Sequence, residues 1–119
     1  PYPMASALPH QPPVDHTPRT ETNVSVTRDD PTDVLQALTS ETAQQILVAL
    51  QDQPATVSDV ANATGTSLQN AAYHLEQLCD AALVTPVGQW YSEKGNKMTV
   101  YALATEQLVI ELGTTEVSG

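Results

Sequence analysis

Two capped helices joined at a glycine constrain this chain more than any other feature of its sequence. Thr56, followed three residues later by Asp59, is a capping pair that predicts a helix start at Thr56. Gly65 can adopt the left-handed conformation that ends a helix in a tight turn, and Ser67 is a good N-cap for the next helix. The sequence therefore predicts two helices that meet at Gly65, the second running to about Cys79.

Two further helices are predicted ahead of this pair. Asp30 as N-cap and Pro31 as first helical residue predict a helix over about 31–38, and Ser40 caps a second helix that ends before Pro54. Apolar residues in these helices recur at helical spacing, which predicts their buried faces. The four predicted inward faces are Val34, Leu35 and Leu38; Ala43, Ile46, Leu47 and Leu50; Val60 and Ala61; and Leu68, Ala71, Leu75, Leu78 and Ala82.

A hairpin and a last helix complete the predicted order. Strands are expected over about 83–91 and 98–104, with residues 92–97 as the loop and Gly95-Asn96 at its tip. Thr105 is expected to cap a helix containing Leu108, Val109, Ile110 and Leu112. Helices followed by a hairpin and a helix form the winged helix-turn-helix plan, an α+β, mainly α fold with a two-stranded wing. The helix after Gly65 is the one that reads DNA in this plan.

Several stretches along this plan resemble ArsR-type regulators. Residues 37–47 resemble the opening helix pair of that family, and residues 56–61 resemble the helix leading into the turn. Residues 65–67 and 73–78 resemble the recognition helix, and 82–84 the run into the wing, with Ala82 where a glycine is usual. The resemblance covers about 33–104 and implies a DNA-binding regulator whose terminal helices pair across a two-fold axis.

The charge balance indicates the salt concentration in which this protein works. Fourteen Asp and Glu against four Lys and Arg give a formal net charge of −10. Such an acidic surface suits molar salt, where self-repulsion is screened within roughly 3 Å at 1 M. We expect a halophilic, archaeal regulator in a very salty cytoplasm, and the resemblance suggests a stress response to reactive oxygen species. An ordinary acidic cytosolic protein is the alternative.

Proline sets the N-terminal residues apart. Six of the nine prolines fall in residues 1–29, so this segment is expected to be an arm without helix or central strand. Val24 and Val26 alternate with polar residues, which permits a short edge strand. The arm could cross a partner subunit or follow DNA. The expected divisions are thus a Pro-rich arm (1–29), the DNA-binding domain (30–104), and a C-terminal dimerisation helix and tail (105–119).

The expected DNA contacts come from the reading helix and the wing. Lys94 and Lys97 are the only bases of residues 31–119, which carry ten acids, and both flank the hairpin tip, where a wing contacts phosphates. Gln and Asn on the outer helix face can pair with adenine edges. The expected contacts are Ser67, Gln69, Asn70, Tyr73, Gln77, Lys94, Asn96 and Lys97. Alternatively, these are a solvated helix face and an ordinary turn.

A homodimer on palindromic double-stranded DNA follows from the apolar terminal helices. Two reading helices would then lie one DNA turn, roughly 34 Å, apart. The expected dimerisation residues are Val34, Leu35, Leu38, Leu108, Val109 and Leu112. The alternative is that the last helix packs only on its own core.

Other chemistry has little support in the sequence. Residues 55–60, where the family's metal sensors carry cysteines, contain no Cys or His, so no metal site is expected. His74 and Cys79, the only cysteine, are expected to pack inside, and no disulfide, membrane segment, secretory signal or enzyme motif is expected. No cofactor is expected beyond K⁺ or other cations loosely held at the DNA interface. A protein-binding winged helix that does not touch DNA is the remaining alternative.

Overall fold

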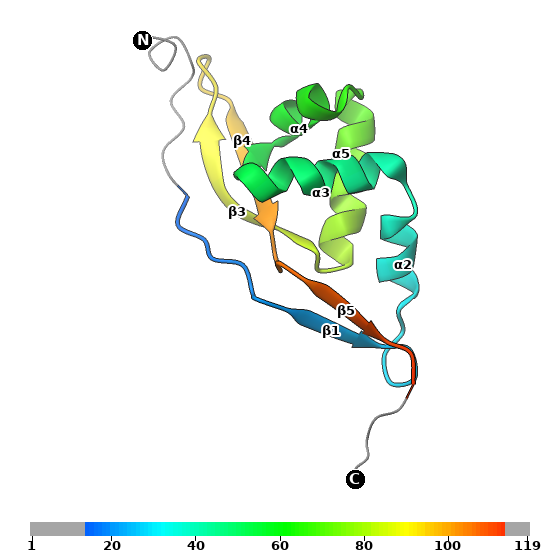
Figure 1. Ribbon diagram of the computed structural model, residues 1–119. Coiled ribbons are helices and arrows are strands. Elements are labelled where there is room, and N and C mark those ends of the chain that lie inside the picture. The colour runs from blue at the N-terminus through cyan, green and yellow to red at the C-terminus, as the bar shows by residue number, and fades with distance from the viewer. Residues whose placement is uncertain (1–13, 114–119) are drawn as a thin grey trace.

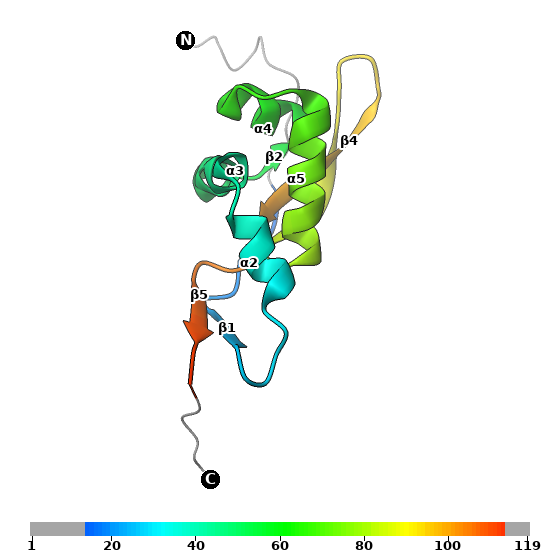
Figure 2. The ribbon, with the colours of Figure 1, turned by 90° about the vertical axis from the view of Figure 1, so that its right-hand side faces the viewer.

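A cluster of four helices packs beside a small antiparallel sheet, and a two-stranded ribbon extends away from both. This computed structural model describes residues 14–113 (Figures 1 and 2). The helices are α2 (Thr32–Leu38), α3 (Glu41–Asp52), α4 (Val57–Thr64) and α5 (Leu68–Asp80). The strands are β1 (Thr22–Ser25), β2 (Ala55–Thr56), β3 (Val84–Tyr91), β4 (Lys97–Leu103) and β5 (Leu108–Glu111).

The capping residues of α3, α4 and α5 act as the sequence predicts. The Thr56 hydroxyl accepts the Asp59 N–H at 3.2 Å, and the Asp59 carboxylate accepts the Thr56 N–H at 3.1 Å. Gly65 ends α4 at φ 70°, and the Ser67 hydroxyl accepts an N–H of the first turn of α5. Ser40 caps α3 in the same way, so three of the four helix starts are confirmed to the residue.

The start of α2 lies one residue later than predicted. Pro31, not Asp30, is the N-cap, and the helix begins at Thr32. Asp30 still supports this start, because one carboxylate oxygen accepts both the N–H and the hydroxyl of Thr32, at 3.0 and 2.6 Å. These hydrogen bonds lower the pKa of Asp30, the side-chain bond contributing most.

The core lies where the helices face the sheet. Within the helices, its buried apolar side chains belong to the predicted stripes except for Ala37, and the sheet and connecting segments add others. The largest fully buried side chains are Ile46, Leu75, Leu78, Val60, Val84 and Val100. Three predicted core positions are wrong. Leu35 is 43% exposed, because α2 buries Val34 and Ala37 instead. Leu68 is 58% exposed, because it is the first residue of α5 and burial on this face begins one turn later at Ala71. Ala82 is exposed at φ 62°, in the turn that leaves α5.

The wing sheet has three strands in the order β2–β4–β3 rather than the two predicted. β2 was missed because it has only two residues, Ala55 and Thr56, which pair with Tyr101 and Val100 of β4. β3 and β4 form the predicted hairpin, with a register shift between Pro86 and Gly88. The strand β2 ties the start of α4 to the sheet and thereby holds the helix pair against the wing.

The prediction of a C-terminal helix is wrong. Residues 108–111 form β5, which pairs in parallel with β1, and we call this two-stranded sheet the terminal ribbon (Figure 1). Thr105 does not cap a helix, because its hydroxyl donates to the Gln107 carbonyl oxygen at 3.0 Å. The β-branched Val109 and Ile110 favour a strand. The strand that pairs with them, β1, lies near the other end of the chain, at residues 22–25.

Residues 14–26 of the expected arm lie along their own chain. His16 Nε2 donates to the Leu103 carbonyl oxygen at 2.9 Å, and the Arg19 N–H donates to the Ala104 carbonyl oxygen at 3.0 Å. The short strand that the Val24 and Val26 alternation permitted is confirmed as β1. Residues 1–13 of the arm and 114–119 of the tail lie outside the described residues.

Candidate nucleic-acid interface

The reading helix and the wing tip lie at the same end of the molecule. The N-terminal end of α5 and the turn between β3 and β4 point the same way in both ribbon views (Figures 1 and 2). Along α5, Gln69, Ala72, Tyr73 and Glu76 are exposed, while Ala71, Leu75 and Leu78 are buried. This helix therefore presents one open face over its whole length.

Not all predicted contact residues on α5 are equally available. Ser67 caps the helix, and the half-buried Asn70 donates its amide N–H to the Thr66 hydroxyl at 2.8 Å. The Gln77 amide donates to the Tyr73 hydroxyl at 2.9 Å, across one turn of the exposed face. These bonds orient the polar side chains, so Ser67 and Asn70 hold the turn while Gln69 and Tyr73 extend outward.

The exposed Leu68 is the residue that the sequence reasoning missed. It begins α5 beside Gln69, and its apolar side chain is more than half exposed. An exposed leucine at the start of a reading helix can contact the methyl group of thymine. Its position directly after the N-cap Ser67 was the available signal, because a helix can project its first residue beyond the core.

His74 lies between the open and buried faces of α5. Its ring is half-buried and meets the Tyr73 ring edge-on, with centroids 5.2 Å apart. The predicted packed histidine is therefore partly covered by a tyrosine of the same helix. This contact also limits the directions in which the Tyr73 ring can turn.

The wing tip presents its two lysines on an ordered turn. Ser92 and Asn96 are joined by a backbone hydrogen bond of 2.9 Å, and Gly95 adopts φ 83° between them. Lys94 and Lys97 are both exposed, and Asn96 donates its N–H to the Ser92 hydroxyl. Hydrogen bonds within the turn therefore hold the backbone that carries the positive charges of the wing.

Acidic side chains lie along α5 and in the wing turn. Glu76 and Asp80 are exposed on α5, and Glu93 is exposed next to Lys94. Far from the tip, Arg28 forms an ion pair with Glu111 at 3.3 Å. The surface that carries the reading helix is thus mostly negative, with two lysines at one end.

Cys79 is half-buried at the end of α5, rather than fully inside. Burial raises the pKa of its thiol, and the nearby carboxylates of Asp80 and Glu76 raise it further. The pKa of Tyr101 is raised mainly by burial as well. A thiol that stays protonated is a poor nucleophile, so this environment does not activate Cys79 for oxidation.

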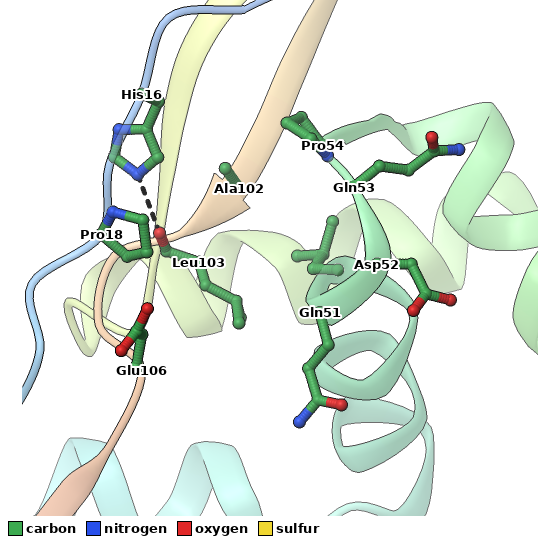
Figure 3. Close-up of a pocket in the computed structure, with 10 residues that line it drawn as sticks. His16, Pro18, Gln51, Asp52, Gln53, Pro54, Ala102, Leu103 and Glu106 are labelled. Carbon is green, nitrogen blue, oxygen red and sulfur yellow. Dashed lines mark hydrogen bonds between the residues drawn. The ribbon is translucent and has the colours of Figure 1, made fainter.

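Two hollows border the segment that passes His16. A cavity of about 340 Å³ lies between this segment and the end of α3, with Asp52 and Glu106 on its rim (Figure 3). A second, of about 460 Å³, includes Arg19 and Cys79 in its lining. Within residues 14–113, no three His, Cys, Asp or Glu side chains gather as metal ligands would.

These features define a winged helix-turn-helix fold. A helix-turn-helix domain family matches residues 38–87, which cover α3 to the middle of β3. No protein of curated function matches the chain. In the described part, no helix is both long and apolar enough to cross a bilayer.

Two solved structures of similar fold are named as a transcription regulator and a possible one. The chain is 29% identical to a crystal structure of a possible transcriptional regulatory protein (fragment 1–100) from Mycobacterium bovis, with TM-score 0.53, covering 61% of this chain and 72% of that one. It is 25% identical to an ArsR family transcriptional regulator, RHA00566, with TM-score 0.50, covering 60% and 72%.

A third similar structure is the solution structure of the homodimeric DNA-binding domain Mb0332 from M. bovis, a possible ArsR-family regulator. It is 27% identical with TM-score 0.49, and the match covers 61% of this chain and 62% of that one, less than two thirds of its length. The chain therefore has the winged helix-turn-helix fold of ArsR-family transcription regulators, a family of regulators rather than enzymes.

Proposed function

We propose that this chain is a sequence-specific, DNA-binding transcription regulator that acts as a homodimer at high salt. The observation that carries the proposal is that the N-terminal end of α5, a helix with one exposed face, and the lysine-bearing wing turn lie at the same end of the molecule (Figure 2). Helix α5 would enter the major groove, and residues 92–97 would lie along the phosphate backbone. The similarity to ArsR-family regulators supports the same function.

Base reading would start at the N-terminal end of α5. Gln69 is exposed there and can pair with an adenine edge, while Leu68 can cover a thymine methyl. Tyr73 and Gln77, joined by their hydrogen bond, would meet a base or a phosphate one to two turns further along. Ser67 and Asn70 would act mainly by holding the turn, with their remaining oxygen atoms available to the backbone.

Cations would complete an interface that has few basic side chains. Lys94 and Lys97 can neutralise two phosphates directly, whereas Glu76, Asp80 and Glu93 would repel DNA. K⁺ held between these carboxylates and the phosphates would remove that repulsion. A basic protein releases counterions on binding and loses affinity as salt rises, but an interface that retains cations would lose little or gain.

The biological setting extends this proposal. The net charge of −10 supports a halophilic, archaeal source, and two-fold symmetry would require a palindromic target. Repression by covering a promoter is the simplest mechanism, because it requires DNA binding alone. If the regulator responds to reactive oxygen species, the raised pKa of Cys79 makes this thiol a poor sensor, so oxidant response should survive Cys79→Ser.

Fluorescence anisotropy with pooled promoter DNA, from about 0.1 to 3 M KCl, tests the proposal. Specific binding that persists at high salt supports the proposed regulator. A steep loss of affinity as KCl rises would contradict the proposal that cations are retained at the interface. The variant Lys94→Gln/Lys97→Gln should weaken binding to all sequences. Arg19→Gln, which changes one exposed positive charge outside the interface, is the matched control.

A base substitution tests the reading role of Leu68. Once a target is selected, replacing thymine by uracil removes the methyl group without changing base pairing. If Leu68 covers that methyl, one position should lose roughly three- to fivefold in affinity, as expected for about one buried methyl group. The same substitution should have no effect on Leu68→Ala, whereas an equal loss in both proteins would contradict the contact.

A winged helix that binds a partner protein is the second candidate. The exposed carboxylates along α5 favour it, since they would suit a basic protein surface. An absence of DNA binding at every salt concentration would support this candidate and leave the wing lysines as an ordinary turn.

A further inference from the structure

The terminal ribbon is a small sheet in an exposed position. Its two strands have four residues each, and it extends from the helical cluster rather than packing across it (Figure 1). Val24 and Leu108 reach the core, but Val26 and Leu112, at its far end, are 40% and 77% exposed. A two-stranded sheet of this size is marginally stable on its own, so a further strand paired to one of its edges would stabilise it.

The hydrogen bonds of the ribbon identify which backbone groups face outward. Thr22 and Val26 donate their N–H groups to the carbonyl oxygens of Gln107 and Glu111. In a parallel pair, alternate residues of each strand face the neighbour, so Val109 also faces β1. The N–H and carbonyl groups of Leu108 and Ile110 therefore point to the opposite edge of β5, where no other described strand pairs with it.

The outer edge of β1 is closed by its own turn. The Ser25 N–H donates to the Asp29 carboxylate at 2.8 Å, and the Asp29 N–H donates to the Ser25 carbonyl oxygen at 2.8 Å. Both backbone groups of Ser25 on that edge are thus occupied. An added strand could not pair there without breaking these bonds.

The outer edge of the wing sheet is protected as well. β3 carries Pro86, which has no N–H, and a register shift between Pro86 and Gly88. Proline and irregular register are the usual means by which sheet edges avoid pairing with other chains. β5 has neither feature, so among the described strands its edge differs from those of β1 and β3 in being left open.

Charge favours a second copy of this chain as the occupant of that edge. An acidic protein of net charge −10 repels itself, and self-association needs a surface with few carboxylates. β5 contains one, Glu111, which is paired with Arg28. Leu108, Ile110 and Leu112 alternate along the chain, so they form one apolar row on one face of the ribbon.

We propose that two copies of this chain associate through β5, with the strands antiparallel across a two-fold axis. Outward-facing residues must pair with one another, which places Ile110 opposite Ile110 of the second copy. Leu108 then lies opposite Leu112, so the most exposed leucine is covered. The result is a four-stranded sheet, β1–β5–β5–β1, in place of the paired terminal helices that the sequence predicts. This inference rests on the homodimer proposed above.

Ile110→Pro tests the pairing in the full chain. Proline removes an N–H that faces away from β1, so the ribbon keeps its own bonds while the dimer loses two. The dimer dissociation constant should rise roughly tenfold to a hundredfold, measured by sedimentation in molar KCl. Asn23→Pro is the matched control, because the Asn23 N–H also faces outward, at the other edge, and dimerisation should be unchanged.

A cross-link decides the question if Ile110→Pro fails to fold. In a Cys79→Ser background, Ile110→Cys places two thiols opposite each other, about 5.5 Å apart at Cα, within the range that a disulfide bridges. Mild oxidation should give a covalent dimer, whereas Asn23→Cys should dimerise without forming a covalent link. A wild-type dimer that tolerates Ile110→Pro and gives no cross-link overturns the β5 interface alone. A wild-type monomer in molar KCl overturns the homodimer itself, while DNA binding is tested separately.

Discussion

The helix-turn-helix and the terminal ribbon are stabilised in different ways. In α4 and α5, each helix start is stabilised by a residue three positions away, and the inner faces share one buried core. In the ribbon, each strand depends on a partner from the other end of the chain, and much of its surface is exposed. The comparison shows how a small domain can combine a well-buried helix-turn-helix with a lightly supported sheet.

The difference also separates two kinds of surface. The helix-turn-helix exposes two large apolar residues, Leu68 and Tyr73, both on the face proposed to read DNA. The ribbon leaves apolar residues outside at its far end, where Val26 and Leu112 lie. One region is complete within a single chain, and the other offers an edge that a second chain could use.

Truncating a core leucine should have the largest effect on stability. Leu75 is 1% exposed, so Leu75→Ala should lower the free energy of unfolding by about 2–5 kcal/mol. Val26→Ala, at the exposed end of the ribbon, should change it by about 0.5 kcal/mol or less. Urea unfolding in molar KCl, followed by circular dichroism, measures both. Similar losses would mean that the ribbon folds as part of the core.

Removing the cap of α4 should have an intermediate effect. Thr56→Ala leaves the Asp59 N–H without its acceptor and should cost about 1 kcal/mol. The comparable ribbon change, Arg28→Ala, breaks an exposed ion pair that is worth about 0–1 kcal/mol and less when salt screens it. The two losses in the free energy of unfolding should become similar only at low salt, where the ion pair is not screened. A larger loss for Arg28→Ala in molar KCl would reverse the comparison.

Glycine at position 82 should stabilise the fold. Ala82 has φ 62°, a conformation that disfavours a side chain, so Ala82→Gly should raise the free energy of unfolding by up to about 1 kcal/mol. Ala72→Gly, in the middle of α5, should lower it by about 0.5–1 kcal/mol. Denaturant unfolding should therefore show changes of opposite sign in the free energy of unfolding for these two variants. That difference would identify the backbone conformation at position 82 as the cause. A loss at position 82 would contradict the left-handed turn.

The smallest effect concerns Cys79, where α5 meets the segment leading to the ribbon. Because burial raises its pKa, the thiol should react with iodoacetamide more slowly in the folded protein than in the unfolded chain. The unfolded thiol ionises first, from about pH 8.5, so this group's contribution to stability falls as pH rises through the folded pKa. Cys79→Ser should lose that pH dependence. Equal alkylation rates, folded and unfolded, would show that the thiol is open.

The predictable part of the molecule is the part whose signals are local. Capping residues, Gly65 and the spacing of apolar residues predicted α3, α4, α5 and the β3–β4 hairpin, because each signal acts within about one helical turn or one hairpin. The candidate site could be predicted to the same extent. Gln69, Tyr73 and the wing lysines are exposed as expected, but Leu68 was assigned to the core.

The sequence by itself determined the winged helix-turn-helix, the acidic surface and the position of the two lysines. Only the tertiary structure decided that residues 108–111 form a strand, because the hydrogen bonds that stabilise it come from residues 22–26 at the other end of the chain. It also decided the roles of Leu68 and Ala82, whose burial depends on where the core ends. Helical periodicity describes which side of an element a residue lies on, but packing decides whether anything covers that side.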